Sequence, residues 1–256
     1  MRSLLSRLDH RFVPQPDPAR VGWLADWTYA HRGLHGAGRV ENSASAFRAA
    51  IASGFGIECD IQRSADDVAM VFHDWDFTRL IGRPENSASL TAAEWRALSY
   101  LEGEEPPIAL KELLELVEGS VPILIEIKSK RGYDVERSCE AVADCLASYD
   151  GLHAVMSFDV RVSRWFRKNG PQTVQGLVMR EDDKGYTQKA WQRHLALWAA
   201  KPEFLAYHVE ALPNPMVAAL REAGLPIATW TVSVPELAER AQANADALIA
   251  EGEGIG

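Results

Sequence analysis

Short apolar runs alternate with longer amphipathic stretches from Trp27 to the end of the chain. Nine runs have the length and composition of buried strands, at residues 28–31, 56–61, 69–73, 122–128, 153–158, 173–178, 203–208, 226–232 and 245–250. Stretches of helical length separate most of them, for example at residues 43–53, 135–148, 160–169 and 215–223. This alternation predicts parallel strands joined by helical crossovers.

The third run fits a hairpin better than a barrel strand. Only residues 62–68 separate it from the second run, which is too short for a crossover helix, so residues 69–73 are predicted to pair with the preceding strand. The next segment, residues 74–107, contains turn residues and a short predicted helix at 92–98. The eight remaining runs predict a TIM (β/α)8 barrel with a β-hairpin and a small excursion after strand 2.

Composition and length agree with one globular domain. The 256 residues are 47% hydrophobic and 25% charged, and α/β barrels commonly use about 250 residues in one piece. No linker rich in Pro, Gly or Ser and no internal repeat interrupts the pattern. We therefore predict a single domain over residues 1–256, with its core at about residues 27–250.

The net charge and the cysteine content indicate what kind of partner the protein binds and in which cell compartment it is found. Lys and Arg number 27 against 36 Asp and Glu, a net charge of −9 without a long basic run, which disfavours nucleic acid and favours a small-molecule partner. The 3 cysteines match neither a disulfide framework nor a metal site. No apolar run reaches the ~18 residues of a membrane span and no signal-peptide pattern is found, so we predict a cytoplasmic protein.

The first residues carry an amphipathic pattern. One helical stripe is apolar and basic residues flank it: Leu4, Leu5, Leu8 and Phe12 with Arg2, Arg7 and Arg11. A short helix that caps the barrel is the simpler interpretation, and a weak contact with a membrane surface is the alternative.

Ionisable residues occur inside two of the predicted strands. Glu58 and Asp60 are two residues apart, so they share one strand face while the alternate positions are apolar. The same spacing places Glu126 and Lys128 on one face of the fourth run, opposite a face of isoleucines. Because the isoleucine faces suit the helical layer, the charged faces are predicted to point into the barrel, near the carboxyl ends of the strands.

Three carboxylates in one cavity repel one another unless a cation lies among them. Glu58, Asp60 and Glu126 offer only oxygen ligands, a set that favours Mg²⁺ or Ca²⁺, with Mn²⁺ as a further option, over zinc. The alternative is a metal-free network of salt bridges with Lys128 and Arg32.

Two histidines end predicted strands. His31 ends the first run and His73 ends the hairpin strand, so both rings are expected at the same mouth as the carboxylates. Imidazole titrates near neutral pH, and a pair of imidazoles can give and take a proton in one reaction. Arg32 and Lys128 add positive charge, and a mixture of metal, Arg and Lys favours a phosphate group as the substrate anion.

Three further positions are candidates. Asn42 is predicted to be the N-cap of the helix at residues 43–53. Three roles are open for Glu41: its charge stabilises the N-terminus of the same helix, it holds Arg32, or it approaches the metal. Trp230 interrupts an apolar strand near its end, where it either borders the pocket or packs in the core.

Motifs spread from about Tyr29 to Ile249 resemble those of the glycerophosphodiester phosphodiesterase family. In chain order they are HRG (31–33), EN (41–42), AF (46–47), E-x-D (58–60), HD (73–74), E-x-K (126–128), SF (157–158) and WTV (230–232). The resemblance implies a TIM-barrel phosphoric diester hydrolase that converts glycerophosphodiesters to glycerol 3-phosphate and an alcohol with a divalent metal.

The resemblance also implies a role for each site residue. It implies metal ligands at Glu58, Asp60 and Glu126, acid–base roles for His31 and His73, phosphate contacts from Arg32 and Lys128, an orienting role for Glu41, and substrate contact at Trp230. Two other functions stay open. One is a lysophospholipase D-like activity on lipid phosphodiesters, which the N-terminal stripe and any apolar surface patch around Trp75, Phe77 and Trp95 would favour. The other is a catalytically silent barrel that binds phosphorylated ligands.

Overall fold

The computed structural model describes residues 8–9, 11–36 and 38–255. The predicted N-terminal stripe, with Leu4 and Leu5, therefore lies mostly outside the described residues. The chain divides into two compact units, Met1–Thr28 with Ala154–Gly256, and Tyr29–His153.

In the unit Tyr29–His153, β2 (Gly56–Arg63) is the central strand. It pairs in parallel with β1 (Thr28–Ala30) and with β4 (Ile123–Ile127), and antiparallel with β3 (Ala69–Val71). The predicted hairpin is thus confirmed, because the short connection between β2 and β3 leaves no room for a crossover helix.

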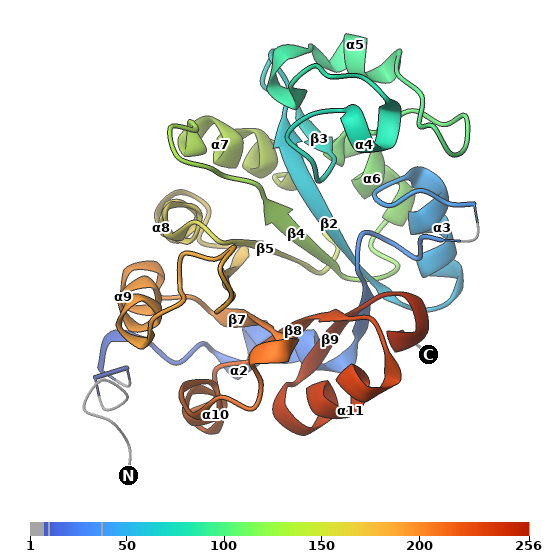
Figure 1. Cartoon of the computed structure of the whole chain (residues 1–256). Helices are drawn as coiled ribbons and strands as arrows, with labels where there is room; N and C mark the ends of the chain where they lie inside the picture. Colours follow the sequence, from blue (N-terminus) through green and yellow to red (C-terminus); the bar gives the residue numbers. More distant parts are fainter. Residues whose placement is uncertain (1–7, 10, 37, 256) are drawn as a thin grey trace. The chain divides into compact units, whose positions relative to one another are not determined.

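Helices of this unit connect its strands. Their bounds are α3 (Ala44–Ala52), α4 (Thr78–Ile81), η2 (Ser87–Ser89), α5 (Ala92–Arg96), α6 (Leu110–Val117) and α7 (Val135–Leu146). Three of them, α4, η2 and α5, form the predicted excursion between β3 and β4. Figure 1 shows α4 and α5 gathered beyond the end of β2, next to β3.

The excursion has its own aromatic core. The ring of Trp95 meets the rings of Phe72 and Phe77 edge-on, with centroids 5.4 and 4.6 Å apart. Phe77 and Trp95 have 0% exposed surface. Phe77 and Trp95 therefore do not form the apolar surface patch that would favour activity on lipid phosphodiesters, because both fill the core that holds the excursion together.

The unit that contains Ala154–Gly256 has five successive parallel strands. They are β5 (His153–Ser157), β6 (Val174–Met179), β7 (Phe204–His208), β8 (Ile227–Val232) and β9 (Ala247–Ala250). Helices join each strand to the next: α8 (Val160–Asn169), α9 (Ala190–Ala200), α10 (Pro215–Glu222) and α11 (Pro235–Asn244). Shorter elements are α2 (Pro18–Val21), η1 (Gly22–Asp26), η3 (Val209–Ala211) and η4 (Gly252–Gly254).

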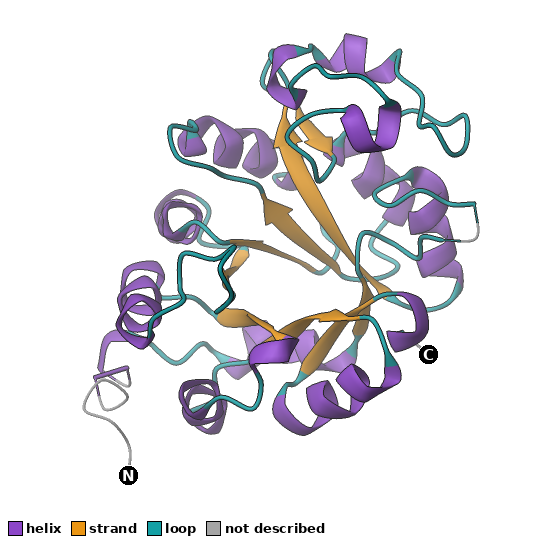
Figure 2. Cartoon of the chain, in the orientation of Figure 1, coloured by secondary structure: helices purple, strands orange, loops and turns teal. Residues whose placement is uncertain are grey.

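Eight parallel strands separated by helices define the fold class as the predicted TIM (β/α)8 barrel. Figure 2 distinguishes the strands, in orange, from the helices that connect them, in purple. In this fold the residues at the carboxyl ends of the strands build the active site. In the described part of the chain, no helix combines the length and the apolar composition that crossing a bilayer requires.

Candidate functional site

Three buried carboxylates meet where β2 and β4 run side by side. Glu58 and Asp60 belong to β2, and Glu126 belongs to β4, where the parallel register sets it opposite Asp60. Their exposed surfaces are only 2%, 2% and 8%. Each offers a carboxylate oxygen, and these oxygens all lie within 4.8 Å of one another. Strand alternation and register together bring these side chains to one place.

Two cations reach this cluster. Lys128 Nζ lies 3.0 Å from Asp60 Oδ1 and 2.8 Å from Glu126 Oε1, and Arg32 Nε lies 3.1 Å from Asp60 Oδ2. Burial opposes ionisation of Asp60, but Lys128 and Arg32 outweigh it and hold the pKa of Asp60 well below its usual range. Burial also opposes the Lys128 cation, yet Asp60 and Glu126 raise the pKa of Lys128 above its ordinary value. Lys128 is therefore a fixed positive charge at neutral pH.

Glu58 is less well compensated. Its Oε2 accepts a hydrogen bond from the backbone N–H of Arg32 at 3.1 Å and lies 4.0 Å from His31 Nε2. Burial, together with repulsion from Asp60 and Glu126, raises the pKa of Glu58 well above its ordinary value. The cluster thus has the oxygen donors and the deficit of positive charge that suit a hard divalent cation.

The turn after β1 positions Arg32. Its backbone is left-handed, with φ +56°, and its guanidinium Nη1 donates to Glu41 Oε1 at 2.7 Å. Gly33 follows with φ +78°, and a Cβ at this position would lie 2.9 Å from the carbonyl carbon of Ala46 in α3. Position 33 therefore excludes any side chain, because the turn packs directly on α3.

The prediction for Asn42 is wrong. The N-cap of α3 is Ser43, whose hydroxyl accepts from the backbone N–H of Ala46 at 3.2 Å. Asn42 is buried in a left-handed conformation, and its Nδ2 donates to Asp60 Oδ2 at 2.9 Å while its Oδ1 accepts from the Asp60 N–H at 3.3 Å. Because Ser43 caps the helix, the amide of Asn42 is available to hold Asp60.

His73 is held by a second set of contacts. Its Nδ1 lies 2.7 Å from Asp74 Oδ1, and Arg79 Nε donates to Asp74 Oδ2 at 2.7 Å. Gln62 Nε2 donates to the carbonyl oxygens of His73 and Asp74, at 3.1 Å each. The segment that carries the imidazole is therefore fixed through both its backbone and its side chain.

Arg79 connects the contacts that hold His73 to the contacts that hold Arg32. Its Nη2 donates to Glu41 Oε1 at 2.7 Å, and Glu41 in turn holds Arg32. In the described part of the chain the network holds five carboxylates against three permanent cations, so the formal charges of these groups sum to −2 when all five carboxylates are ionised. The five carboxylates are Glu41, Glu58, Asp60, Asp74 and Glu126, and the three cations are Arg32, Arg79 and Lys128.

Sequence reasoning missed Gln62 and Arg79. Gln62 continues the alternation of Glu58 and Asp60 by two more residues, so the strand pattern carried a signal for it. Arg79 lies in α4, within the excursion, where no periodic pattern marks it.

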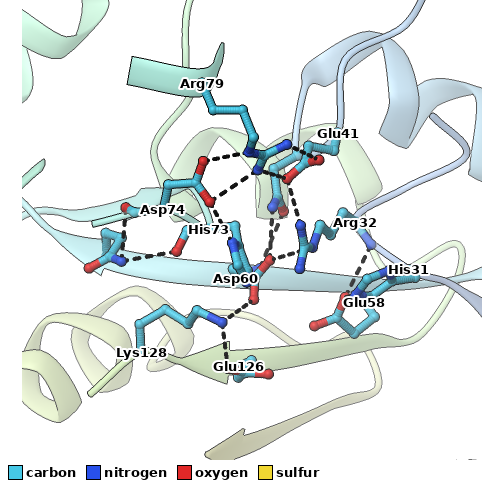
Figure 3. A network of polar contacts seen from close by, with 12 residues as sticks. His31, Arg32, Glu41, Glu58, Asp60, His73, Asp74, Arg79, Glu126 and Lys128 are labelled. Atoms are coloured by element: carbon cyan, nitrogen blue, oxygen red, sulfur yellow. Dashed lines mark hydrogen bonds and ion pairs between the residues drawn. The ribbon is translucent and has the colours of Figure 1, made fainter. Parts of the chain in front are cut away.

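Figure 3 shows His31 beside Glu58 and His73 beside Asp74, on either side of Asp60. Both histidines are close enough to Asp60 for their charge to lower its pKa. The His31 side chain is 14% exposed and that of His73 is 31% exposed. A cavity of about 490 Å³ opens next to His73, lined by His73, Asp74, Trp75, Asp76, Thr78, Arg79 and Lys128.

Trp230 belongs to β8, in the other unit. Its Nε1 donates to the carbonyl oxygen of Ala206 at 3.1 Å, the ring of Phe158 meets it edge-on at 5.4 Å, and the guanidinium of Arg180 lies 5.5 Å from its centroid. The residue is partly exposed. Its contact with substrate stays a prediction.

The comparisons with known proteins identify the family of this chain. The model of the Glycerophosphoryl diester phosphodiesterase family matches residues 31–251, which include the predicted HRG, E-x-D, HD and E-x-K motifs. A search of curated proteins finds no match. The predicted family resemblance is thereby confirmed.

Solved structures share the fold over most of the chain. A glycerophosphodiester phosphodiesterase from Thermotoga maritima is 25% identical, with a TM-score of 0.73 over 89% of this chain and 94% of that chain. An Oleispira antarctica phosphodiesterase in complex with the product sn-glycerol-3-phosphate is 20% identical, with a TM-score of 0.76 over 96% of each chain. Because the family match spans most of its residues, this chain belongs to the glycerophosphoryl diester phosphodiesterase family and is a phosphoric diester hydrolase.

Proposed function

We propose that this chain hydrolyses glycerophosphodiesters to glycerol 3-phosphate and an alcohol, as one functional domain over residues 1–256. The observation that carries the proposal is the buried carboxylate cluster with a histidine on either side. The product named for the Oleispira antarctica phosphodiesterase supports the same substrate class.

We propose Glu58, Asp60 and Glu126 as the ligands of a divalent metal, Mg²⁺ or Ca²⁺. A net negative formal charge and a buried all-oxygen donor set fit such an ion. When bound, a divalent cation would supply charge neutralisation for a non-bridging phosphoryl oxygen. In the metal-free alternative, Lys128 pairs with both Asp60 and Glu126. The ionised form of Glu58 would remain destabilised by burial and by the neighbouring carboxylates.

The two histidines would move the protons of the reaction. The Asp74 carboxylate at Nδ1 favours the tautomer of His73 that carries its proton there, so Nε2 is the atom that exchanges a proton. One histidine removes a proton from the attacking oxygen, of water or of the glycerol 2-hydroxyl, as the new O–P bond forms. The other gives a proton to the leaving alkoxide as the old P–O bond breaks. Attack by the 2-hydroxyl gives a cyclic phosphate, and water then opens that ring to glycerol 3-phosphate while the two histidines exchange roles.

Arg32 and Lys128 would hold the phosphate oxygens. Both are fixed cations in a buried setting, where a hydrogen bond to an anion is stronger than in water. Glu41 orients Arg32, and Trp230 is proposed to border the substrate.

The test is the release of glycerol 3-phosphate from glycerophosphocholine by the purified protein. Exhaustive chelation is expected to abolish the activity, and Mg²⁺ or Ca²⁺ to restore it. His31→Ala and His73→Ala are each expected to lower kcat by about 10² to 10⁴ with an unchanged circular dichroism spectrum, whereas the control His153→Ala keeps full activity. Undiminished turnover after chelation would exclude the metal, and near-normal turnover in either histidine variant would exclude the two-histidine scheme.

The same assay separates the alternatives. Choline release from lysophosphatidylcholine without turnover of glycerophosphocholine would favour the lysophospholipase D-like activity. Binding of glycerol 3-phosphate without turnover of either substrate, with any of the three ions, would favour a silent barrel.

A further inference from the structure

The outward face of α9 carries an apolar stripe. Trp191, Leu195 and Trp198 are spaced by four and three residues, so they lie on one face of the helix. Trp198 is partly buried and packs against the core at the edge of the stripe. Trp191 is 54% exposed and Leu195 is 51% exposed. Leu197 lies on another face of the helix and packs in the core. Phe12 extends the stripe, because it is 40% exposed and its ring centroid lies 5.2 Å from that of Trp198.

The contacts beneath this stripe are well defined. Asp9 is only 3% exposed, and its Oδ1 lies 2.8 Å from His194 Nδ1 and accepts from Trp198 Nε1 at 2.8 Å. These bonds attach the segment around Asp9 to α9. The exposed rings are therefore presented by an ordered framework.

The neighbouring helix α8 is strongly basic. Its sequence, VRVSRWFRKN, contains four basic residues and no acidic residue, in a chain whose net charge is −9. Arg161, Arg164 and Lys168 are exposed and spaced by three and four residues, so they share one face. Arg161 pairs with Asp159, the N-cap of the helix, at 2.7 Å. Arg167 donates to the carbonyl oxygen of Ala200 at the end of α9, and Figure 1 shows the two helices next to each other.

We propose that α8 and α9 form a docking surface for an anionic lipid membrane. Trp191, Leu195 and Phe12 would enter the interface between headgroups and acyl chains, where amphipathic rings are favoured. Arg164 and Lys168 would lie near lipid phosphates, which attract basic side chains. A membrane fits both features at once, whereas a nucleic acid would leave the exposed leucine without a partner.

The proposal does not depend on the hydrolase mechanism. None of its residues belongs to the network of Figure 3, so the substitutions below leave that network intact. A surface of this kind would bring the protein to membranes without a spanning helix.

The test is co-sedimentation with vesicles of phosphatidylcholine alone or mixed equally with phosphatidylglycerol. We expect binding to the mixed vesicles only. The double variant Arg164→Gln/Lys168→Gln is expected to lower the partition coefficient about 30-fold, and Trp191→Ser/Leu195→Ser to lower it on the order of tenfold.

Matched controls come from the other unit. Leu152→Ser removes a side chain that is 46% exposed, and Arg48→Gln/Lys111→Gln removes two exposed charges from α3 and α6. Both controls are expected to bind like the unchanged protein, and circular dichroism checks that every variant folds.

Three kinds of result would overturn the proposal. The first is no binding to anionic vesicles, or equal losses in the controls. The second is a dimer in solution that Trp191→Ser/Leu195→Ser dissociates, which would assign the surface to a second copy of the chain. The third is binding to a DNA duplex as tightly as to vesicles.

Discussion

At the scale of single residues, His73 and Arg32 are connected through one side chain. Arg79 donates to Asp74, which holds the His73 ring, and to Glu41, which holds the Arg32 guanidinium. The Arg79 side chain is 49% exposed, so its contacts serve to position these groups more than to fill the core. An exposed side chain can be removed at small cost in stability.

We predict that Arg79→Leu lowers kcat for glycerophosphocholine between about 10-fold and 100-fold, because Asp74 and Glu41 lose the partner that orients them. Arg79→Lys should retain more activity, since it keeps the charge but not the fork of donors. Arg83→Gln, in the same excursion, is the matched control, and its kcat should equal that of the unchanged protein. Steady-state kinetics and a melting temperature for each protein check this, and a normal kcat in Arg79→Leu would contradict it.

A second prediction concerns the buried charge of Glu58. Glu58→Gln removes repulsion with Asp60 and Glu126 while keeping the shape and an acceptor for the Arg32 N–H. In the presence of a chelator the variant should melt higher, by about 2 to 4 °C for each kcal/mol of repulsion removed. Adding Mg²⁺ or Ca²⁺ should raise the melting temperature of the unchanged protein but not of the variant. A variant that melts lower in chelator would show that Glu58 is not destabilised.

At the scale of elements, the connection from β1 to α3 organises the site. It places Arg32 and Asn42 in left-handed conformations, and Ser43 caps α3 in place of Asn42. Gly33 permits this path, because its α-carbon faces Ala46 and Phe47 with no space for a methyl group.

We predict that Gly33→Ala destabilises the fold much more than Gly36→Ala. Both glycines have positive φ, so both substitutions cost about 1 to 2 kcal/mol of backbone strain. Only at Gly33 would the new Cβ meet atoms at 2.9 to 3.0 Å, which adds about 1 to 3 kcal/mol. Urea unfolding of the two variants measures the difference, and equal losses would contradict the close packing on α3.

At the scale of the whole molecule, the family match runs from residue 31 to residue 251 and so includes strands of both compact units. A TIM barrel is ordinarily one cooperative domain, because a closed set of strands has no edge at which to separate. We therefore expect the two units to unfold together.

The corresponding prediction is a single thermal transition. Far-ultraviolet circular dichroism and tryptophan fluorescence should give the same midpoint, since both units contain strands and tryptophans. Two separated transitions would instead indicate two domains. The unchanged protein in chelator and in Mg²⁺ should both show one transition, at different temperatures.

Local sequence patterns predicted much of the fold and part of the candidate site. Alternation of strands and helices predicted the barrel, and a seven-residue connection predicted the hairpin of β2 and β3. Period-two spacing predicted that Glu58, Asp60 and Glu126 share faces, because strand geometry has only two faces to offer. Whether Phe77 and Trp95 line a surface patch or fill a core could not be read from the sequence, since hydrophobicity alone does not distinguish the two.

The sequence by itself determined the fold class, the acidic strand faces and the histidines at strand ends, because these follow from spacings within one element. The tertiary structure alone decided that Asn42 holds Asp60, that Arg79 joins Asp74 to Glu41, and that an apolar stripe lies beside a basic helix. Those contacts join residues from separate elements, and their distances depend on loop conformations and packing that no local period encodes.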